Sequence, residues 1–284
     1  MWGTDPPTCS VEDLAEACAR DIASIAAAAD VRSAIPHMTA NSKTYEGYAS
    51  SGSLYVTTAA TYPAPPLTDQ AHRALYTTRL LAKDTDARLY YEALKAAAKL
   101  RRCPYCNLGA VRTLDHFLPK STYPSLAIDP INLLPACRDC NTTMLARLVT
   151  TAEEEFFHAY FERVEVNWLQ ATIIPGTVGA AIFTCDPPEE DLGEVERRRI
   201  RNQFEVLDLG NLYGDAAAAA LVQHTVAARR DYANGGGAEA VRWGCLEAAS
   251  SIDRSGPNEW RAALYRGMAS SDWYCEEGFE ADGQ

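Results

Sequence analysis

Two Cys-x-x-Cys pairs lie near the middle of the chain. The first pair is Cys103 and Cys106 in "CPYC", and the second, after thirty intervening residues, is Cys137 and Cys140 in "CRDC". Two thiolates at this spacing bind one Zn²⁺ ion at about 2.3 Å, and two such turns complete a tetrahedron. The spacing therefore predicts a structural zinc site, which contributes on the order of 10 kcal/mol or more to folding.

Other uses of paired cysteines fit the sequence less well. The chain has nine cysteines, and an odd number without a signal peptide argues against a disulfide framework. A thioredoxin-like redox pair would need a neighbouring βαβ unit, which the sequence pattern does not indicate. Four free buried thiols are the alternative to a zinc site, and the doubling of the pair argues against it.

The segment between the pairs carries side chains suited to phosphodiester hydrolysis, which needs an activated water and a cation near the developing charge. His116 is the histidine of this segment, and a neutral imidazole suits a general base. Asp115 precedes it on an expected strand and so points to the other face. Its carboxylate and the amide oxygen of Asn141 form a ligand set that suits Mg²⁺.

A strand, a loop, a second strand and a short helix are expected to hold these residues. Residues 111–116 predict the first strand and "AIDPINLLPAC" a second extended piece. The stretch "RDCNTTMLARLV" predicts a helix at the second cysteine pair, opened by Asn141.

This order of motifs resembles the HNH endonucleases, the ββα-metal nucleases, in the subset with a four-cysteine zinc site. The resemblance rests on "CPYC", "LDHFLPKS", "INLLPAC" and "CRDCN", and it covers residues 103–149. It implies that Asp115 and Asn141 hold a catalytic Mg²⁺ or Mn²⁺ ion. It also implies that His116 is the general base and that Asn132 orients the loop as part of the catalytic set.

The motif departs from the family pattern at Met144, three residues after Asn141. The family often has a lysine there, which can stabilise charge on the scissile phosphate. Methionine cannot supply a cation. We therefore expect either slow turnover or replacement of that charge by Lys120, Arg138 or Arg147.

The formal net charge of −12 disfavours nucleic-acid binding, unless positive charge is concentrated locally. Residues 79–120 hold nine Lys or Arg against four Asp or Glu, a balance of +5, which leaves −17 for the remainder. A basic strip beside the motif can follow a nucleic-acid backbone. The expected contacts are Lys99, Arg102, Arg112, Lys120 and Arg138.

The remaining sequence predicts an α+β protein in which the small ββα module is embedded in mostly helical chain. Three parts are expected: a helical and irregular region (1–68), the nuclease module with its preceding helix (69–150), and a helical region with a short β-hairpin (151–284). In the first part, a helix from Val11 to about Ala29 should precede an irregular stretch from Ile35 to Pro66 with a short strand at "SLYVTT".

These features predict a metal-dependent endonuclease that cuts DNA, with structural zinc and catalytic Mg²⁺ or Mn²⁺. The alternative is a catalytically silent zinc module that serves as an adaptor for nucleic-acid or protein partners. HNH proteins of this kind also occur in bacterial anti-phage defence complexes, where the partner can be an ATPase. No apolar stretch is long enough to span a bilayer, and we expect a cytoplasmic protein.

Overall fold

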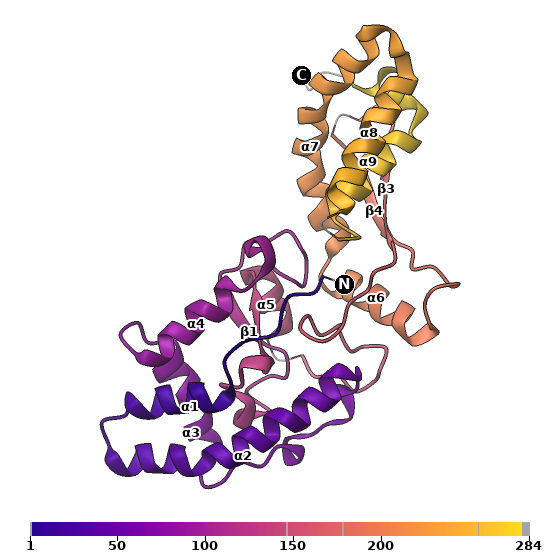
Figure 1. Cartoon of the computed structure of the whole chain (residues 1–284). Helices are drawn as coiled ribbons and strands as arrows, with labels where there is room; N and C mark the ends of the chain where they lie inside the picture. Colours follow the sequence, from indigo (N-terminus) through magenta and orange to yellow (C-terminus); the bar gives the residue numbers. More distant parts are fainter. Residues whose placement is uncertain (1, 146, 178, 255, 280–284) are drawn as a thin grey trace. The chain divides into compact units, whose positions relative to one another are not determined.

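The computed structural model describes residues 2–145, 147–177, 179–254 and 256–279, and it confirms the predicted fold class (Figure 1). The chain is mostly helical, with two small two-stranded sheets and a buried cluster of four cysteines. It forms two compact units, Met1–Arg163 and Val164–Gln284. Within the described residues, no helix is long and apolar enough to cross a membrane.

Two helices begin the first unit where a single one is predicted. Helix α1 (Val11–Arg20) starts as expected, because the side chains of Ser10 and Asp13 cap each other's backbone N–H groups. It ends at Arg20 rather than near Ala29. Helix α2 (Ile25–Ser50) then begins afresh, with the Ser24 hydroxyl accepting a hydrogen bond from a backbone N–H in its first turn.

The irregular region predicted from residue 35 is wrong for its first half, because α2 continues through Pro36 to Ser50. Contacts with distant parts of the chain stabilise this portion. The Asn41 side chain donates to the Pro63 carbonyl at 3.1 Å, and Tyr45 is fully buried. The predicted strand at 53–58 is also wrong, since Leu54–Val56 forms a 3-10 turn.

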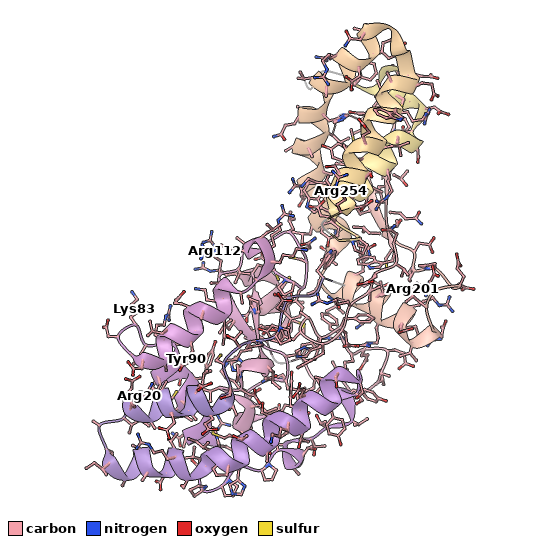
Figure 2. All side chains as sticks on the ribbon, in the orientation of Figure 1. Arg20, Lys83, Tyr90, Arg112, Arg201 and Arg254 are labelled. Atoms are coloured by element: carbon pink, nitrogen blue, oxygen red, sulfur yellow. The ribbon has the colours of Figure 1, made fainter. Side chains whose placement is uncertain are left out.

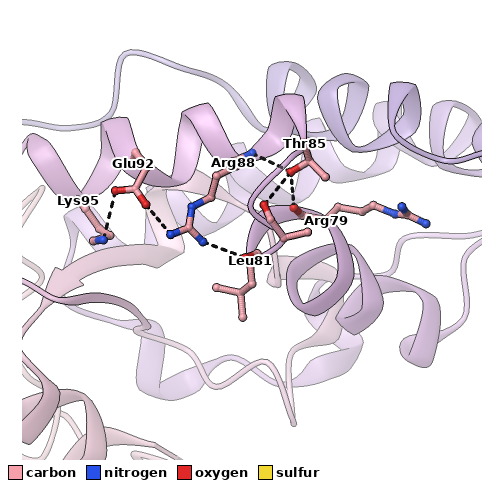
Figure 3. A network of polar contacts seen from close by, with 7 residues as sticks. Arg79, Leu81, Thr85, Arg88, Glu92 and Lys95 are labelled. Atoms are coloured by element: carbon pink, nitrogen blue, oxygen red, sulfur yellow. Dashed lines mark hydrogen bonds and ion pairs between the residues drawn. The ribbon is translucent and has the colours of Figure 1, made fainter.

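Before the first cysteine pair the chain forms α3 (Asp69–Ala74), a π-helical turn (Leu75–Leu80), α4 (Asp86–Ala96) and a 3-10 turn (Lys99–Arg101). The helical spacing of Leu89, Ala93, Leu94, Ala97 and Leu100 predicts an apolar face for this stretch, and that prediction is partly wrong. Leu89 is 72% exposed, whereas Ala87, Tyr91 and Leu94 are buried. A polar network along the other side ties Glu92 to Arg88 and Lys95 and connects Arg88 to the Leu81 carbonyl (Figure 3).

The motif region forms the predicted strand, loop, strand and helix. Strand β1 (Thr113–His116) pairs antiparallel with β2 (Leu133–Ala136), and Asp115 lies opposite Leu134. Helix α5 (Arg138–Met144) packs against β1. Cys137, rather than Asn141, opens this helix: its sulfur accepts a hydrogen bond from the Cys140 N–H. Asn141 therefore lies at the fourth position of α5.

The second unit is a β-hairpin covered by helices. Strands β3 (Leu169–Ile173) and β4 (Ala181–Cys185) pair antiparallel as predicted. The helices that follow are α6 (Glu194–Val206), α7 (Leu209–Asp231), α8 (Gly237–Asp253) and α9 (Trp260–Ser270), with a π-helical turn (Tyr232–Gly236) before α8. Helix α9 packs on β3 and α7 packs on β4. The helices that pack on the two strands of this hairpin therefore belong to the same unit as the hairpin.

Candidate active site

The four paired cysteines meet in one buried cluster. Their sulfur atoms all lie within 4.8 Å of one another, and those of Cys106 and Cys137 are 4.0 Å apart. Sulfur atoms around a tetrahedral Zn²⁺ ion are about 3.8 Å apart. The cluster therefore has the donor atoms and nearly the dimensions of a structural zinc site.

Backbone hydrogen bonds shape both cysteine turns. In the first turn, the Cys103 N–H donates to the Gly109 carbonyl (2.8 Å), and the Gly109 N–H donates to the Cys106 sulfur (3.3 Å). In the second turn, the Cys140 N–H donates to the Cys137 sulfur (3.4 Å). An N–H group directed at sulfur favours the thiolate, which is the form that binds zinc.

Gly109 allows the two turns to approach each other. A Cβ atom at this position would lie 2.7 Å from the Cβ atom and 2.9 Å from the sulfur of Cys137. Any other residue would therefore push the second cysteine pair away from the first.

Asp115 lies on the face of β1 that meets the first cysteine turn. It is 4% exposed, and the Tyr105 hydroxyl donates to its Oδ2 atom at 2.9 Å. Burial raises the pKa of Asp115 to about 6, although the Tyr105 hydrogen bond acts in the opposite direction. Asn141 is half-buried on α5, the helix that packs against β1. The carboxylate and the amide are thus on adjacent elements, and a bound cation would favour ionised Asp115.

His116 points to the opposite face of β1. It is 8% exposed, its Nε2 atom lies 2.9 Å from the Ala127 carbonyl oxygen, and the Tyr76 ring is 4.4 Å away. A carbonyl only accepts hydrogen bonds, so Nε2 carries the proton and Nδ1 carries the lone pair. Burial, together with the charge of Lys120, lowers the pKa of His116 to about 3. The imidazole is therefore neutral at pH 7.

Asn132 braces the loop between the strands. It is fully buried, and its Oδ1 atom accepts from the Leu118 N–H at 2.8 Å. Its Nδ2 atom donates to the carbonyls of Leu118 (3.0 Å) and Leu126 (3.2 Å). This loop carries Ala127, the hydrogen-bond partner of His116. The contacts of Asn132 fit an orienting role, exerted through the loop.

The five expected nucleic-acid contacts differ in exposure. Lys99, Arg112 and Arg138 are exposed, and Arg102 and Lys120 are half-buried; Figure 2 shows Arg112 on the surface of the first unit. Lys120 has its Nζ atom 5.2 Å from the ring of Tyr76, the residue that packs against the base candidate His116.

Cations of the basic strip also have partners within the protein, Lys99 and Arg102 among them. Arg79 donates to the Asp21 carbonyl at 2.9 Å, and Arg88 and Lys95 belong to the network of Figure 3. Fewer cations of this strip can therefore contact a nucleic acid than the number of Lys and Arg residues in the sequence suggests.

Met144 is 5% exposed and lines a small apolar cavity with Phe117, Leu118 and Phe156. Arg147 stacks on Phe156, with its Cζ atom 4.4 Å from the ring centroid. Of the three cations that could replace the family lysine, Lys120 acts electrostatically on His116.

Sequence reasoning missed two polar residues of the site. Tyr105 lies inside the "CPYC" turn, where no spacing rule marks it as a partner of Asp115. Asp129 is 1% exposed and accepts from the Ser42 hydroxyl (3.1 Å) and the Ile131 N–H (3.2 Å). Its position before Pro130 is a known signal for a capping side chain, so this residue could have been found.

Two known proteins are similar to this chain in sequence. Protein ea31 of Escherichia phage lambda is 28% identical over 249 residues, which cover 80% of this chain and 83% of ea31. Septu protein PtuB of Bacillus thuringiensis is 42% identical over 45 residues, which cover 14% of this chain and 18% of PtuB. No family model and no solved structure gives a match. The chain is thus a distant relative of ea31 along most of its length and shares a short segment with PtuB.

Proposed function

We propose that the protein is a metal-dependent HNH endonuclease that hydrolyses DNA. The observation that supports this proposal is the arrangement around β1. Asp115 faces the cysteine turn and α5, while His116 faces the braced loop on the opposite side. The proposed divalent-ion ligand and the proposed base therefore lie on the same strand, beside a site that fits structural zinc.

In this proposal His116 is the general base, acting through Nδ1. The Ala127 carbonyl holds the ring and fixes the tautomer, and Asn132 holds the loop that carries Ala127. Asp115 and Asn141 would hold Mg²⁺ or Mn²⁺, which supplies charge neutralisation at the phosphate when bound. Tyr105, which lies in the first cysteine turn, orients Asp115 through its hydroxyl hydrogen bond to the carboxylate. Lys120 adds positive charge beside the base.

The alternative is a zinc adaptor without catalysis. The observation that favours it is the burial of both candidate groups, because Asp115 is 4% and His116 is 8% exposed. A nuclease would have to uncover them when the substrate and the metal bind. An adaptor would need only the fold and its basic surface.

We also propose that the protein acts within a defence complex, with an ATPase as one class of partner. The segment shared with Septu protein PtuB and the relation to a phage protein support a setting of phage–host conflict. Cleavage by the chain alone and together with products of neighbouring genes would show whether a partner controls the activity.

Plasmid cleavage by the purified protein tests the proposed function. Supercoiled DNA should be nicked with Mg²⁺ or Mn²⁺ and should stay intact with EDTA. The substitution His116→Ala should lower the rate by at least 100-fold, since general-base catalysis contributes about 10²–10⁴-fold. His37→Ala, which changes an exposed histidine on α2, is the matched control. Full zinc content without any cleavage, alone or with partners, would favour the adaptor.

A further inference from the structure

An exposed leucine stands in the most basic part of the chain. Leu100 is 74% exposed, and it lies between Lys99 and Arg101, just before Cys103. Residues 93–114 contain five Lys or Arg and no Asp or Glu, in a chain whose net charge is −12. Leu100 is therefore a large apolar side chain left in solvent within a sequence segment whose charged residues are all positive.

The backbone at this leucine is held in an unfavourable conformation. Leu100 has φ 53° and ψ 18°, and Arg101 follows with φ 57°. Non-glycine residues adopt such left-handed angles rarely, at a cost on the order of 1–3 kcal/mol each. A residue stays in such a strained backbone conformation only where the surrounding structure holds it there.

Backbone hydrogen bonds within this segment and to the first cysteine turn (residues 103–111) hold the conformation. The Val111 N–H donates to the Arg101 carbonyl at 3.0 Å, and the Arg101 N–H donates to the Ala98 carbonyl at 2.9 Å. Arg102 pairs with Ala110 in an isolated β-bridge, directly before the first zinc-binding cysteine. The backbone on the C-terminal side of Leu100 is therefore held in place, while the Leu100 side chain is 74% exposed.

We propose that Leu100 is an apolar wedge that inserts between base pairs of duplex DNA and kinks it at the nuclease site. Proteins that bend DNA insert leucine or similar side chains between base steps, beside Lys or Arg that contact the minor groove and its phosphates. Lys99, Arg101 and Arg112 supply that charge around Leu100, and all three are exposed. The hydrogen bonds at the first cysteine turn would hold the backbone of Leu100 in place while its side chain separates two stacked base pairs.

This inference rests on the proposed DNA substrate, but it does not depend on catalysis. Its test therefore uses protein with the His116→Ala substitution, which should bind DNA without cutting it. A duplex of about 30 base pairs, labelled at both ends for energy transfer, reports bending, since a wedge kinks DNA by about 20–90°. Fluorescence anisotropy of the same duplex reports binding.

Transfer efficiency should rise on binding of His116→Ala and of His116→Ala with Leu89→Ala. Leu89 is the matched control because it is a 72% exposed leucine on α4. With Leu100→Ala the rise should disappear, while binding weakens by no more than about tenfold. Leu100→Met should retain bending, because methionine is also used as a wedge.

Leu100→Gly separates the wedge from a structural role. Glycine accepts positive φ without strain, so this variant should melt at or above the temperature of the unchanged protein and still fail to bend DNA. Equal bending by the Leu100→Ala and unchanged proteins would overturn the proposal. Binding without bending, or no binding of duplex DNA at low salt, would overturn it as well. If the protein with His116 intact bends DNA but does not cut it with Mg²⁺ or Mn²⁺, the proposed nuclease function fails while this inference stands.

Discussion

Asp129 is a carboxylate buried between α2 and the loop that holds His116. Its Oδ1 atom accepts two hydrogen bonds, from Ser42 and Ile131, while Oδ2 has no partner among the described residues. Burial raises the pKa of Asp129 to about 7, and the nearby charge of Glu46 acts in the same direction. The folded protein therefore holds the proton of Asp129 more tightly than the unfolded chain does.

This pKa predicts a specific pH dependence of stability. The contribution of Asp129 is fully present below the unfolded pKa near 4 and is lost as the pH rises to about 7. The loss is at most about 4 kcal/mol. Asp129→Asn removes the titration, so the stability of the variant relative to the unchanged protein should improve between pH 5 and pH 8. Urea unfolding at the two pH values measures this difference.

Asp30→Asn serves as the control, because Asp30 is exposed on α2. Its relative stability should be the same at both pH values. The same result for Asp129→Asn would mean that the buried carboxyl does not titrate in this window.

For the individual site residues, only part of the geometry could be predicted from the sequence. His116 and Asp115 could be placed on opposite faces of one strand because the alternation of a strand is local. Their burial could not be foreseen. It depends on Tyr105 and Tyr76, which come from the cysteine turn and from the segment after α3, and no pairing rule connects them to the motif.

At the scale of elements, the two cysteine turns lie so close together that one methyl group added between them should disturb the metal site. Gly109→Ala should displace Cys137, because the added Cβ atom would lie 2.7 Å from the Cβ atom of that cysteine. Zinc content, measured by elemental analysis, should fall from about one per chain, and the melting temperature should fall with it. Cys137→Ser should act in the same direction because it removes a zinc ligand.

Gly47→Ala is the matched control. A Cβ atom there meets nothing within 4 Å, and Gly47 lies inside α2. Alanine in a helix interior should raise stability by about 0.5–1 kcal/mol. A Gly109→Ala protein with full zinc and an unchanged melting temperature would show that the turns do not need this approach.

Elements with local signals could be predicted, and those that depend on distant contacts could not. The motif strands, α5 and the β3–β4 hairpin follow from short patterns and turn residues. The second half of α2 was missed because Pro36 and the Ser, Thr and Gly residues after it favour loops. Its buried contacts with the Pro63 carbonyl and His158 override that local preference. On α4, packing selected Tyr91 rather than Leu89 for the core.

For the whole molecule, the decisive quantity is the contrast between a net charge of −12 and a short basic segment. Long-range repulsion between the acidic surface and DNA would oppose binding, and the proposed contacts at Lys99 and Arg102 would favour it. Both effects are electrostatic, so both depend on salt. We therefore expect the chain alone to bind duplex DNA weakly at physiological ionic strength, unless a partner contributes further contacts.

The salt dependence of DNA binding tests this balance. The affinity of the His116→Ala protein should fall steeply between about 50 and 200 mM salt. Replacing Lys99 and Arg102 by glutamine should lower the slope of log K against log salt by about two, one for each lost phosphate contact. Replacing Arg20 and Arg32, which are exposed and paired with Asp86 and Glu16, should leave the slope unchanged. Tight binding that ignores ionic strength would mean that contacts other than these cations hold the DNA.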